Sequence, residues 1–329
     1  MTRKTLEEFL FGEEGVERLI HEREYKRALE AIHDEGDLYP ELVRMMMYRR
    51  ICLNAMLGET AEALHLLEKA LEAGIYFPAM VLGPEGTGDP GNPLTLASME
   101  GLPVFERLKA AHQARYEEAM EQAPPVLVTV EPSHPQTEPP PLLFVTHGNV
   151  SNVENEIDYY RLVTESGWLL AMPQSSQPWD VEGRYVWGDW EVTDRQLEKY
   201  WALLNRQAEY DAKRIVTAGI SKGGEVAVWL AMSGQVPARG FVAIAPGGPR
   251  IEEPQKPLPL VEASRERGIK GYLIVGGQDT YCYEPTMRLA SFLREQGILY
   301  ELEIHPDLAH WFPPNFEQSL RHGLEFIVG

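Results

Sequence analysis

The sequence has few cysteines, a deficit of positive charge and no long hydrophobic run. Only two cysteines, Cys52 and Cys282, occur among its 329 residues, and their spacing is not that of metal ligands. A disulfide framework or a zinc ribbon is therefore not expected. No segment approaches the roughly 18 apolar residues of a membrane span, and the N-terminus is acidic where a secretory signal needs an apolar run. These absences predict a cytoplasmic protein without membrane insertion.

The charge balance narrows the class of partner. Lysine and arginine total 30 against 50 aspartates and glutamates, which gives a formal net charge of -20. Nucleic-acid binding needs a clustered cationic surface, so it is not expected. Strongly anionic substrates would also be repelled. A neutral or weakly charged small molecule is the substrate class that this balance favours.

The first third of the chain differs in pattern from the rest. At roughly 150 residues per domain the length suggests about two domains. Residues 1–122 have helical periodicity and no β-branched runs, which predicts an all-helical domain. Ala28-Leu29 recurs as Ala63-Leu64, an offset of 35 residues, and the segment GETAEALHLLEKALEAG resembles part of a tetratricopeptide repeat, whose period is 34. Two or three plain antiparallel helices explain this pattern equally well.

Residues 123–329 have the pattern of an α/β domain. Proline residues exclude a helix at the junction, and the alternating run 126–130 predicts an edge strand. Short, nearly continuous apolar runs then alternate with helical stretches, as in a parallel sheet buried on both faces. The predicted strands are 142–146, 167–172, 214–220, 240–246, 271–277 and 299–305, and the predicted helices are 154–165, 193–209, 224–232, 260–268, 283–296 and 316–327. The fold class expected is a doubly wound, mainly parallel α/β sheet.

The strongest motif is the pentapeptide Gly219-Ile220-Ser221-Lys222-Gly223, which lies between a predicted strand and a predicted helix. This is the context of a nucleophile elbow, where flanking glycines allow a strained turn that exposes the serine hydroxyl. A serine needs a histidine base, and the histidine needs a carboxylate to orient it. We expect Ser221 to be the nucleophile.

Two later loops supply the partners. Asp279 follows the strand 271–277 and is our first choice for the acid, with Asp307 as a weaker alternative. His310 follows the last strand and is our choice for the base. The chain order Ser221, Asp279, His310 is that of α/β-hydrolases and differs from the orders in chymotrypsin and subtilisin.

On these motifs, residues 126–329 resemble the α/β-hydrolase superfamily. The sequences GISKGG, GGQD and DLAHWFP are similar to those of carboxylesterases, dienelactone-hydrolase relatives and prolyl-oligopeptidase catalytic domains. The resemblance implies an oxyanion hole made by the backbone N–H groups of Lys222 and of either Gly148 or Asn149. It gives His147 a role in supporting that loop. It implies no cofactor and no metal.

The aromatic segment 174–190 has no clear periodicity and follows a strand after which hydrolases build substrate pockets. Its aromatic residues, together with one beside His310, are either lining residues of an apolar pocket or ordinary core residues: Trp179, Tyr185, Trp187, Trp190 and Trp311.

These features together predict a serine hydrolase, most simply a carboxylesterase that cleaves small or medium neutral esters through an acyl-enzyme. One alternative is a peptidase or acyl-amino-acid hydrolase of prolyl-oligopeptidase type. Another is a non-catalytic hydrolase scaffold with a helical interaction domain. Because no long helical insertion follows the strand 240–246, we expect residues 1–122 to cap part of the Ser221 cleft. The sequence leaves open whether this domain forms a homo-oligomer or binds a protein partner.

Overall fold

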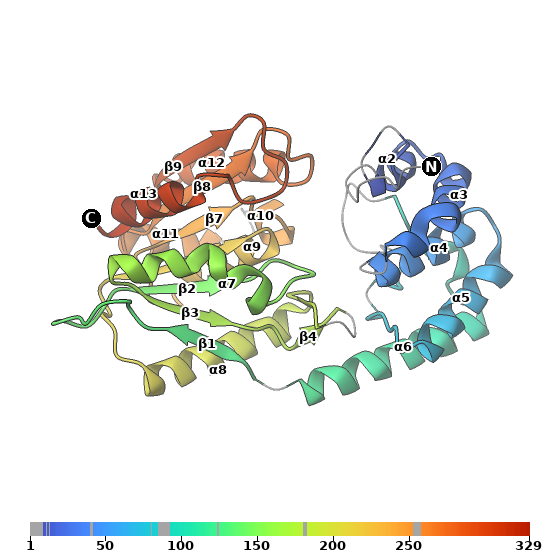
Figure 1. Ribbon diagram of the computed structural model, residues 1–329, viewed down its shortest axis with the longest axis horizontal. Coiled ribbons are helices and arrows are strands. Elements are labelled where there is room, and N and C mark those ends of the chain that lie inside the picture. Colours follow the sequence, from blue (N-terminus) through green and yellow to red (C-terminus); the bar gives the residue numbers. More distant parts are fainter. Residues whose placement is uncertain are drawn as a thin grey trace. The chain divides into compact units, whose positions relative to one another are not determined.

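The computed structural model describes residues 9–10, 12, 14–39, 42–79, 81–84, 93–123, 125–179, 183–252 and 258–329. The chain divides into two compact units, Met1–Gln122 with Asp180–Glu182, and Ala123–Trp179 with Gly183–Gly329 (Figure 1). No helix among the described residues is long and apolar enough to cross a membrane.

The first unit is built from helices that pack on their neighbours in sequence, α2 on α3, α3 on α4, α4 on α5 and α5 on α6. Their bounds are α2 (Val16–His21), α3 (Tyr25–Glu35), η1 (Gly36–Leu38), α4 (Val43–Met56), α5 (Thr60–Glu72), η3 (Ala97–Met99) and α6 (Pro103–Gln122). The expectation of almost continuous helix was wrong between α5 and α6. There the described residues form turns, irregular backbone and the short η3. The likeness to a tetratricopeptide repeat stays a prediction.

The second unit is centred on a seven-stranded sheet of order β1-β3-β2-β6-β7-β8-β9. The strands are β1 (Leu127–Val130), β2 (Leu142–Thr146), β3 (Leu169–Pro173), β6 (Ile215–Ile220), β7 (Gly240–Ile244), β8 (Lys270–Gly276) and β9 (Leu299–His305). β1 pairs antiparallel with β3 at one edge, and the other pairs are parallel. The predicted doubly wound, mainly parallel sheet is confirmed. A small hairpin of β4 (Gln177–Pro178) and β5 (Tyr185–Val186) lies in the aromatic segment and was not expected.

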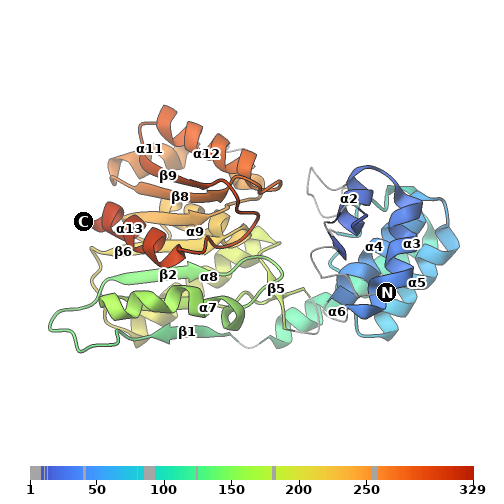
Figure 2. The same cartoon turned by 45° about the horizontal axis from the view of Figure 1, so that its top comes forward.

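Helices cover both faces of this sheet, as Figures 1 and 2 show. α7 (Val153–Arg161), continued by η4 (Leu162–Ser166), and α13 (Phe316–Val328) pack on one face. The other face is covered by α8 (Trp190–Gln207), α9 (Lys222–Ser233), α11 (Leu258–Glu266) and α12 (Tyr283–Glu295), with the short α10 (Pro249–Glu252) beside α9 and α12.

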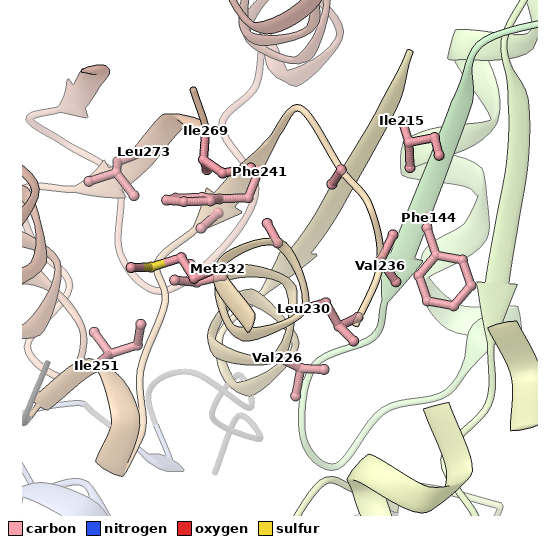
Figure 3. Close-up of a cluster of buried hydrophobic side chains, with 14 of the residues drawn as sticks. Phe144, Ile215, Val226, Leu230, Met232, Val236, Phe241, Ile251, Ile269 and Leu273 are labelled. Carbon is pink, nitrogen blue, oxygen red and sulfur yellow. The ribbon is translucent and has the colours of Figure 1, made fainter. Parts of the chain in front are cut away.

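Alternate strand residues enter two separate cores because successive side chains in a strand point to opposite faces. Leu142 and Phe144 of β2 belong to the core under α9, whereas Leu143 and Val145 belong to the core under α7. Figure 3 shows the first core, to which Phe144 of β2 and Val226 and Leu230 of α9 all contribute. Burial on both faces explains why these strands are continuous apolar runs in the sequence.

Candidate active site

The sheet topology brings the predicted site residues together at the carboxyl ends of the parallel strands. β2, β6, β8 and β9 are mutually parallel through the sheet, so the loops that follow them all leave from the same edge. His147 follows β2, Ser221 follows β6, Asp279 follows β8 and His310 follows β9. Ligands in open α/β sheets bind at this carboxyl edge.

Ser221 lies in a strained turn between β6 and α9. Its backbone φ is 56° and ψ is -126°, a region that residues with a side chain rarely adopt. The turn is tight because of its glycines. A Cβ atom on Gly219 would lie 2.5 Å from the carbonyl of Gly223, and one on Gly223 would lie 2.2 Å from the carbonyl oxygen of Thr146. The motif therefore has the local geometry of a nucleophile elbow.

Asp279 and His310 form a hydrogen-bonded pair. His310 Nδ1 and Asp279 Oδ2 are 2.7 Å apart; the Asp279 side chain is fully buried, whereas that of His310 is 31% exposed. Asp279 Oδ1 accepts the backbone N–H groups of Tyr281 and Cys282, at 3.0 and 2.9 Å. The weaker alternative, Asp307, is exposed.

The charge state of this pair follows from its contacts. Burial raises the pKa of the Asp279 carboxyl, but the hydrogen bonds from His310, Cys282 and Tyr281 outweigh burial and hold the pKa below its ordinary value. An ionised Asp279 accepts a hydrogen bond from the N–H at His310 Nδ1, which leaves Nε2 as the nitrogen able to take a proton from a nucleophile.

Cys282 lies beside this pair. Within the described ranges, Asp279, Cys282 and His310 are the one set of three side chains whose ligand atoms are close enough to hold a metal ion, all within 4.8 Å of one another. Asp279 Oδ2 and His310 Nδ1 are already hydrogen bonded to each other, and a metal would have to replace that bond. The geometry therefore fits proton transfer better than metal binding.

The loop after β2 is held rigidly, and this distinguishes its two candidate oxyanion donors. The Gly148 N–H donates to Glu156 Oε1 at 2.9 Å and is therefore occupied. The Asn149 side-chain oxygen accepts the backbone N–H of Trp187 at 2.8 Å. The Asn149 backbone N–H has no acceptor among the described residues. The Lys222 N–H is at the first position of α9, where a helix offers no acceptor of its own. The available pair is thus Asn149 and Lys222.

Similarity to known proteins is found among solved structures. No protein-family model and no curated protein matches it. An uncharacterized protein from Bacillus cereus ATCC 10987 is similar over 95% of this chain and 96% of its own, with 21% identity and a TM-score of 0.53. Its likeness extends over nearly the full length of both proteins. At this identity the likeness concerns the fold.

The sheet supplies the deciding observation. An antiparallel edge strand, the exchanged order of β3 and β2, and a serine elbow after the next strand occur together with the pair Asp279 and His310 after β8 and β9. The chain has the α/β-hydrolase fold. Solved structures of S-formylglutathione hydrolase FrmB from Staphylococcus aureus (14% identity, 62% of this chain and 93% of that one, TM-score 0.48) and of the Bacillus cereus carboxylesterase (16%, 64% and 99%, 0.47) are also similar.

Within this α/β-hydrolase fold, His147 supports the loop after β2. It is fully buried, and burial lowers its pKa to about 4, so it is neutral. Its Nε2 accepts the Ser175 N–H at 3.1 Å, and its Nδ1 lies 2.7 Å from the Gly148 carbonyl oxygen, to which it donates. Both nitrogens are used, which leaves none for acid–base work.

The predicted pocket tryptophans differ in their surroundings. Trp187 is fully buried, and its indole N–H donates to the His147 carbonyl oxygen at 2.8 Å, so the ring supports the loop and presents no surface to a substrate. Trp190 is partly buried, with the Arg250 guanidinium carbon 3.5 Å from its ring centroid. Trp311 is 56% exposed and directly follows His310. The remaining two candidates are both partly exposed: Trp179 directly follows β4, and Tyr185 is the first residue of β5.

Two buried glutamates near the site were not expected. Glu225, in the first turn of α9, is fully buried, forms an ion pair with Lys222 and accepts the backbone N–H of Arg250 at 2.5 Å. The charge of Lys222 is thereby paired. Glu156 had no assigned role, although its spacing from Val153 and Tyr160 places it on the apolar face of α7. That spacing is the signal that would have identified it.

A cavity of about 570 Å³ lies at the amino ends of the parallel strands. Pro141, which precedes β2, and Arg214, which precedes β6, contribute to its lining. Ser221 follows β6, so this cavity is at the opposite end of the strand from the serine and has no part in its chemistry.

Proposed function

We propose that the chain is a serine hydrolase, most specifically a carboxylesterase acting on small or medium neutral esters. One observation carries the proposal: His310 Nδ1 lies 2.7 Å from the buried carboxylate of Asp279, at the sheet edge from which the strained Ser221 turn also emerges. Simple scaffolding does not require these three groups at one edge. All of the groups proposed to act belong to residues 123–329, which we propose as the catalytic domain.

In this mechanism Ser221 Oγ attacks the ester carbonyl carbon while His310 Nε2 takes the hydroxyl proton. The carbonyl oxygen becomes an oxyanion that accepts the backbone N–H groups of Lys222 and Asn149. Collapse of this intermediate expels the alcohol, which receives the proton from His310, and leaves an acyl group on Ser221. Water, deprotonated by His310, then releases the acid and restores the serine.

The preference for neutral esters is supported by two features. The net charge of -20 disfavours anionic substrates. An exposed aromatic side chain lies beside the base, since the Tyr281 ring centroid is 6.3 Å from that of His310, and the exposed Trp311 is the next residue in the chain. Apolar surface beside the base suits an acyl or alcohol group without charge.

The test is active-site labelling followed by a substrate series. A fluorophosphonate probe should label the wild-type protein at Ser221 and should not label Ser221→Ala, while the Ser233→Ala variant, changed at the last residue of α9, should label normally. p-Nitrophenyl esters of increasing acyl length should be hydrolysed faster than an acyl-amino-acid p-nitroanilide. Labelling of a folded Ser221→Ala protein, or no labelling of the wild type, would refute the proposal. Faster cleavage of the anilide would refute its ester specificity.

A further inference from the structure

Glu156 makes an unusual contact for a buried glutamate. It is 4% exposed on α7, and burial raises its pKa to about 7. Burying a carboxyl group is costly, and glutamate is rarely found inside a protein without a specific partner. Its partners here are the Ser151 side chain and a backbone group, the Gly148 N–H, which donates to Oε1 at 2.9 Å.

The peptide unit that joins His147 to Gly148 is held by hydrogen bonds at both its N–H and its C=O group. In the unit that joins His147 to Gly148, the N–H donates to Glu156, and the carbonyl oxygen accepts the Trp187 indole N–H at 2.8 Å. A planar unit fixed at both polar atoms cannot rotate about its flanking bonds. Glu156 and Trp187 therefore set the orientation of this peptide together.

The next peptide unit contains the candidate oxyanion donor. The Gly148 carbonyl oxygen accepts a hydrogen bond from His147 Nδ1 at 2.7 Å, and the N–H of the same unit belongs to Asn149. In a trans peptide the C=O and N–H point in opposite directions. The Asn149 N–H is thus directed away from the buried His147 ring, and its direction depends on the anchored unit before it.

The same loop is packed against the nucleophile's strand. A Cβ atom on Gly148 would lie 3.3 Å from Glu156 Oε1 and 3.4 Å from Cγ2 of Ile220, the residue before Ser221. Gly148 is therefore enclosed between Glu156 and the end of β6. Loss of the glutamate would leave space on one side of the loop and allow it to move relative to Ser221.

We propose that Glu156 is a positioning residue for the oxyanion hole: its carboxyl oxygen anchors the Gly148 N–H and so aims the Asn149 N–H at the oxygen of the Ser221 adduct. This inference rests on the proposed serine-hydrolase function. The anchor needs an acceptor oxygen and not a charge, because a protonated carboxyl group retains an oxygen that accepts the same N–H.

The experiment compares Glu156→Gln, which keeps an acceptor oxygen, with Glu156→Leu, which removes it. Glu154→Gln, an exposed position on the same helix, is the control. Displacement of a catalytic group by about 1 Å costs about 10²-fold in rate. We expect Glu156→Leu to lower kcat by about 30- to 100-fold with KM changed less than about threefold. Glu156→Gln should stay within about threefold of wild type, because it restores the bond to Gly148.

A second readout separates positioning from general damage. A trifluoromethyl ketone forms an oxyanion adduct with an active serine, whereas the matching methyl ketone binds without one. Glu156→Leu should weaken the trifluoromethyl ketone by the same factor as kcat and leave the methyl ketone unchanged. If Glu156→Leu does not fold, Glu156→Asp, which withdraws the oxygen by one carbon–carbon bond, should give the same selective loss.

Three results would overturn the inference. They are a folded Glu156→Leu with kcat within threefold of wild type, a folded Glu156→Gln as impaired as Glu156→Leu, and equal weakening of the two ketones. Fluorophosphonate labelling of the wild-type protein is done first and tests the proposed function by itself. If the proposed function is wrong, the wild-type protein is not labelled at Ser221. In that case both proposals fall.

Discussion

Replacing Asp279 by asparagine changes one atom of the candidate triad and has a consequence that follows from three hydrogen bonds. Oδ1 accepts two backbone N–H groups, from Tyr281 at 3.0 Å and Cys282 at 2.9 Å, and Oδ2 accepts from His310. Asparagine has one oxygen and one NH₂ group. The two backbone donors require the oxygen on their side, because the opposite orientation would set NH₂ against both N–H groups. The NH₂ group therefore faces His310.

This orientation inverts the histidine tautomer. An NH₂ group can only donate, so His310 Nδ1 must become the acceptor and the ring proton moves to Nε2. In the proposed mechanism, Nε2 is the nitrogen that receives the proton of Ser221. In other serine triads the same substitution lowers kcat by about 10⁴-fold, and that factor corresponds to about 5.5 kcal/mol of barrier. KM should change little, since no group placed near the substrate is altered.

The assay is steady-state hydrolysis of a p-nitrophenyl ester by wild type, Asp279→Asn and Asp307→Asn, each shown to be folded by circular dichroism. Asp307 is the matched control because it is an exposed aspartate three residues before His310. We expect the control to keep kcat within about twofold of wild type, as surface substitutions usually have small effects. A loss below about tenfold in folded Asp279→Asn, or a larger loss in Asp307→Asn, would refute this assignment of the acid.

Three further predictions concern the elbow and the loop after β2. Gly223→Ala should lower the melting temperature much more than Gly224→Ala, because its Cβ would lie 2.2 Å from a backbone oxygen whereas that of Gly224 would lie 3.2 Å from its neighbours; equal shifts would contradict this. Burial raises the pKa of Glu156 from 4.5 to about 7, so the folded protein binds a proton that the unfolded chain has released, and stability should fall as pH rises across this window, by about 3 kcal/mol. In urea unfolding at pH 5 and 7, Glu156→Gln should lack this loss of unfolding free energy between the two pH values. A loss equal to that of wild type would contradict the prediction. Trp187→Phe leaves the buried His147 carbonyl oxygen without its donor, which should cost about 1–3 kcal/mol in urea unfolding; a change below about 0.5 kcal/mol would argue against that bond.

The sequence was informative where the structure depends on local chemistry. β6 is recognisable as the run 214–220 because a strand covered on both faces must be apolar along its whole length. The turn at Ser221 is recognisable for a similar reason, since Gly219 and Gly223 are required by backbone atoms within a few residues and by the adjacent strand. The expected strand segments, and the helices between them, are therefore found close to their predicted bounds.

The sequence was less informative where a contact joins distant segments. Helical periodicity over residues 1–122 did not reveal the irregular backbone between α5 and α6, and the β4–β5 hairpin is too short to leave a pattern. The sequence left Gly148 and Asn149 as equal candidates for the oxyanion donor. Their difference arises from an acceptor on another element, Glu156 of α7.

The sequence by itself determined the strands, the strained serine turn and the chain order Ser221, Asp279, His310, because each depends on residues that are neighbours along the chain or on the average polarity of a segment. Only the tertiary structure decided which polar groups are used. A backbone N–H is available or occupied according to what folds against it, and Trp187 reaches the His147 carbonyl across 40 residues of chain. Partners at such separations are chosen by the packing of helices on the sheet, which no local pattern of residues records.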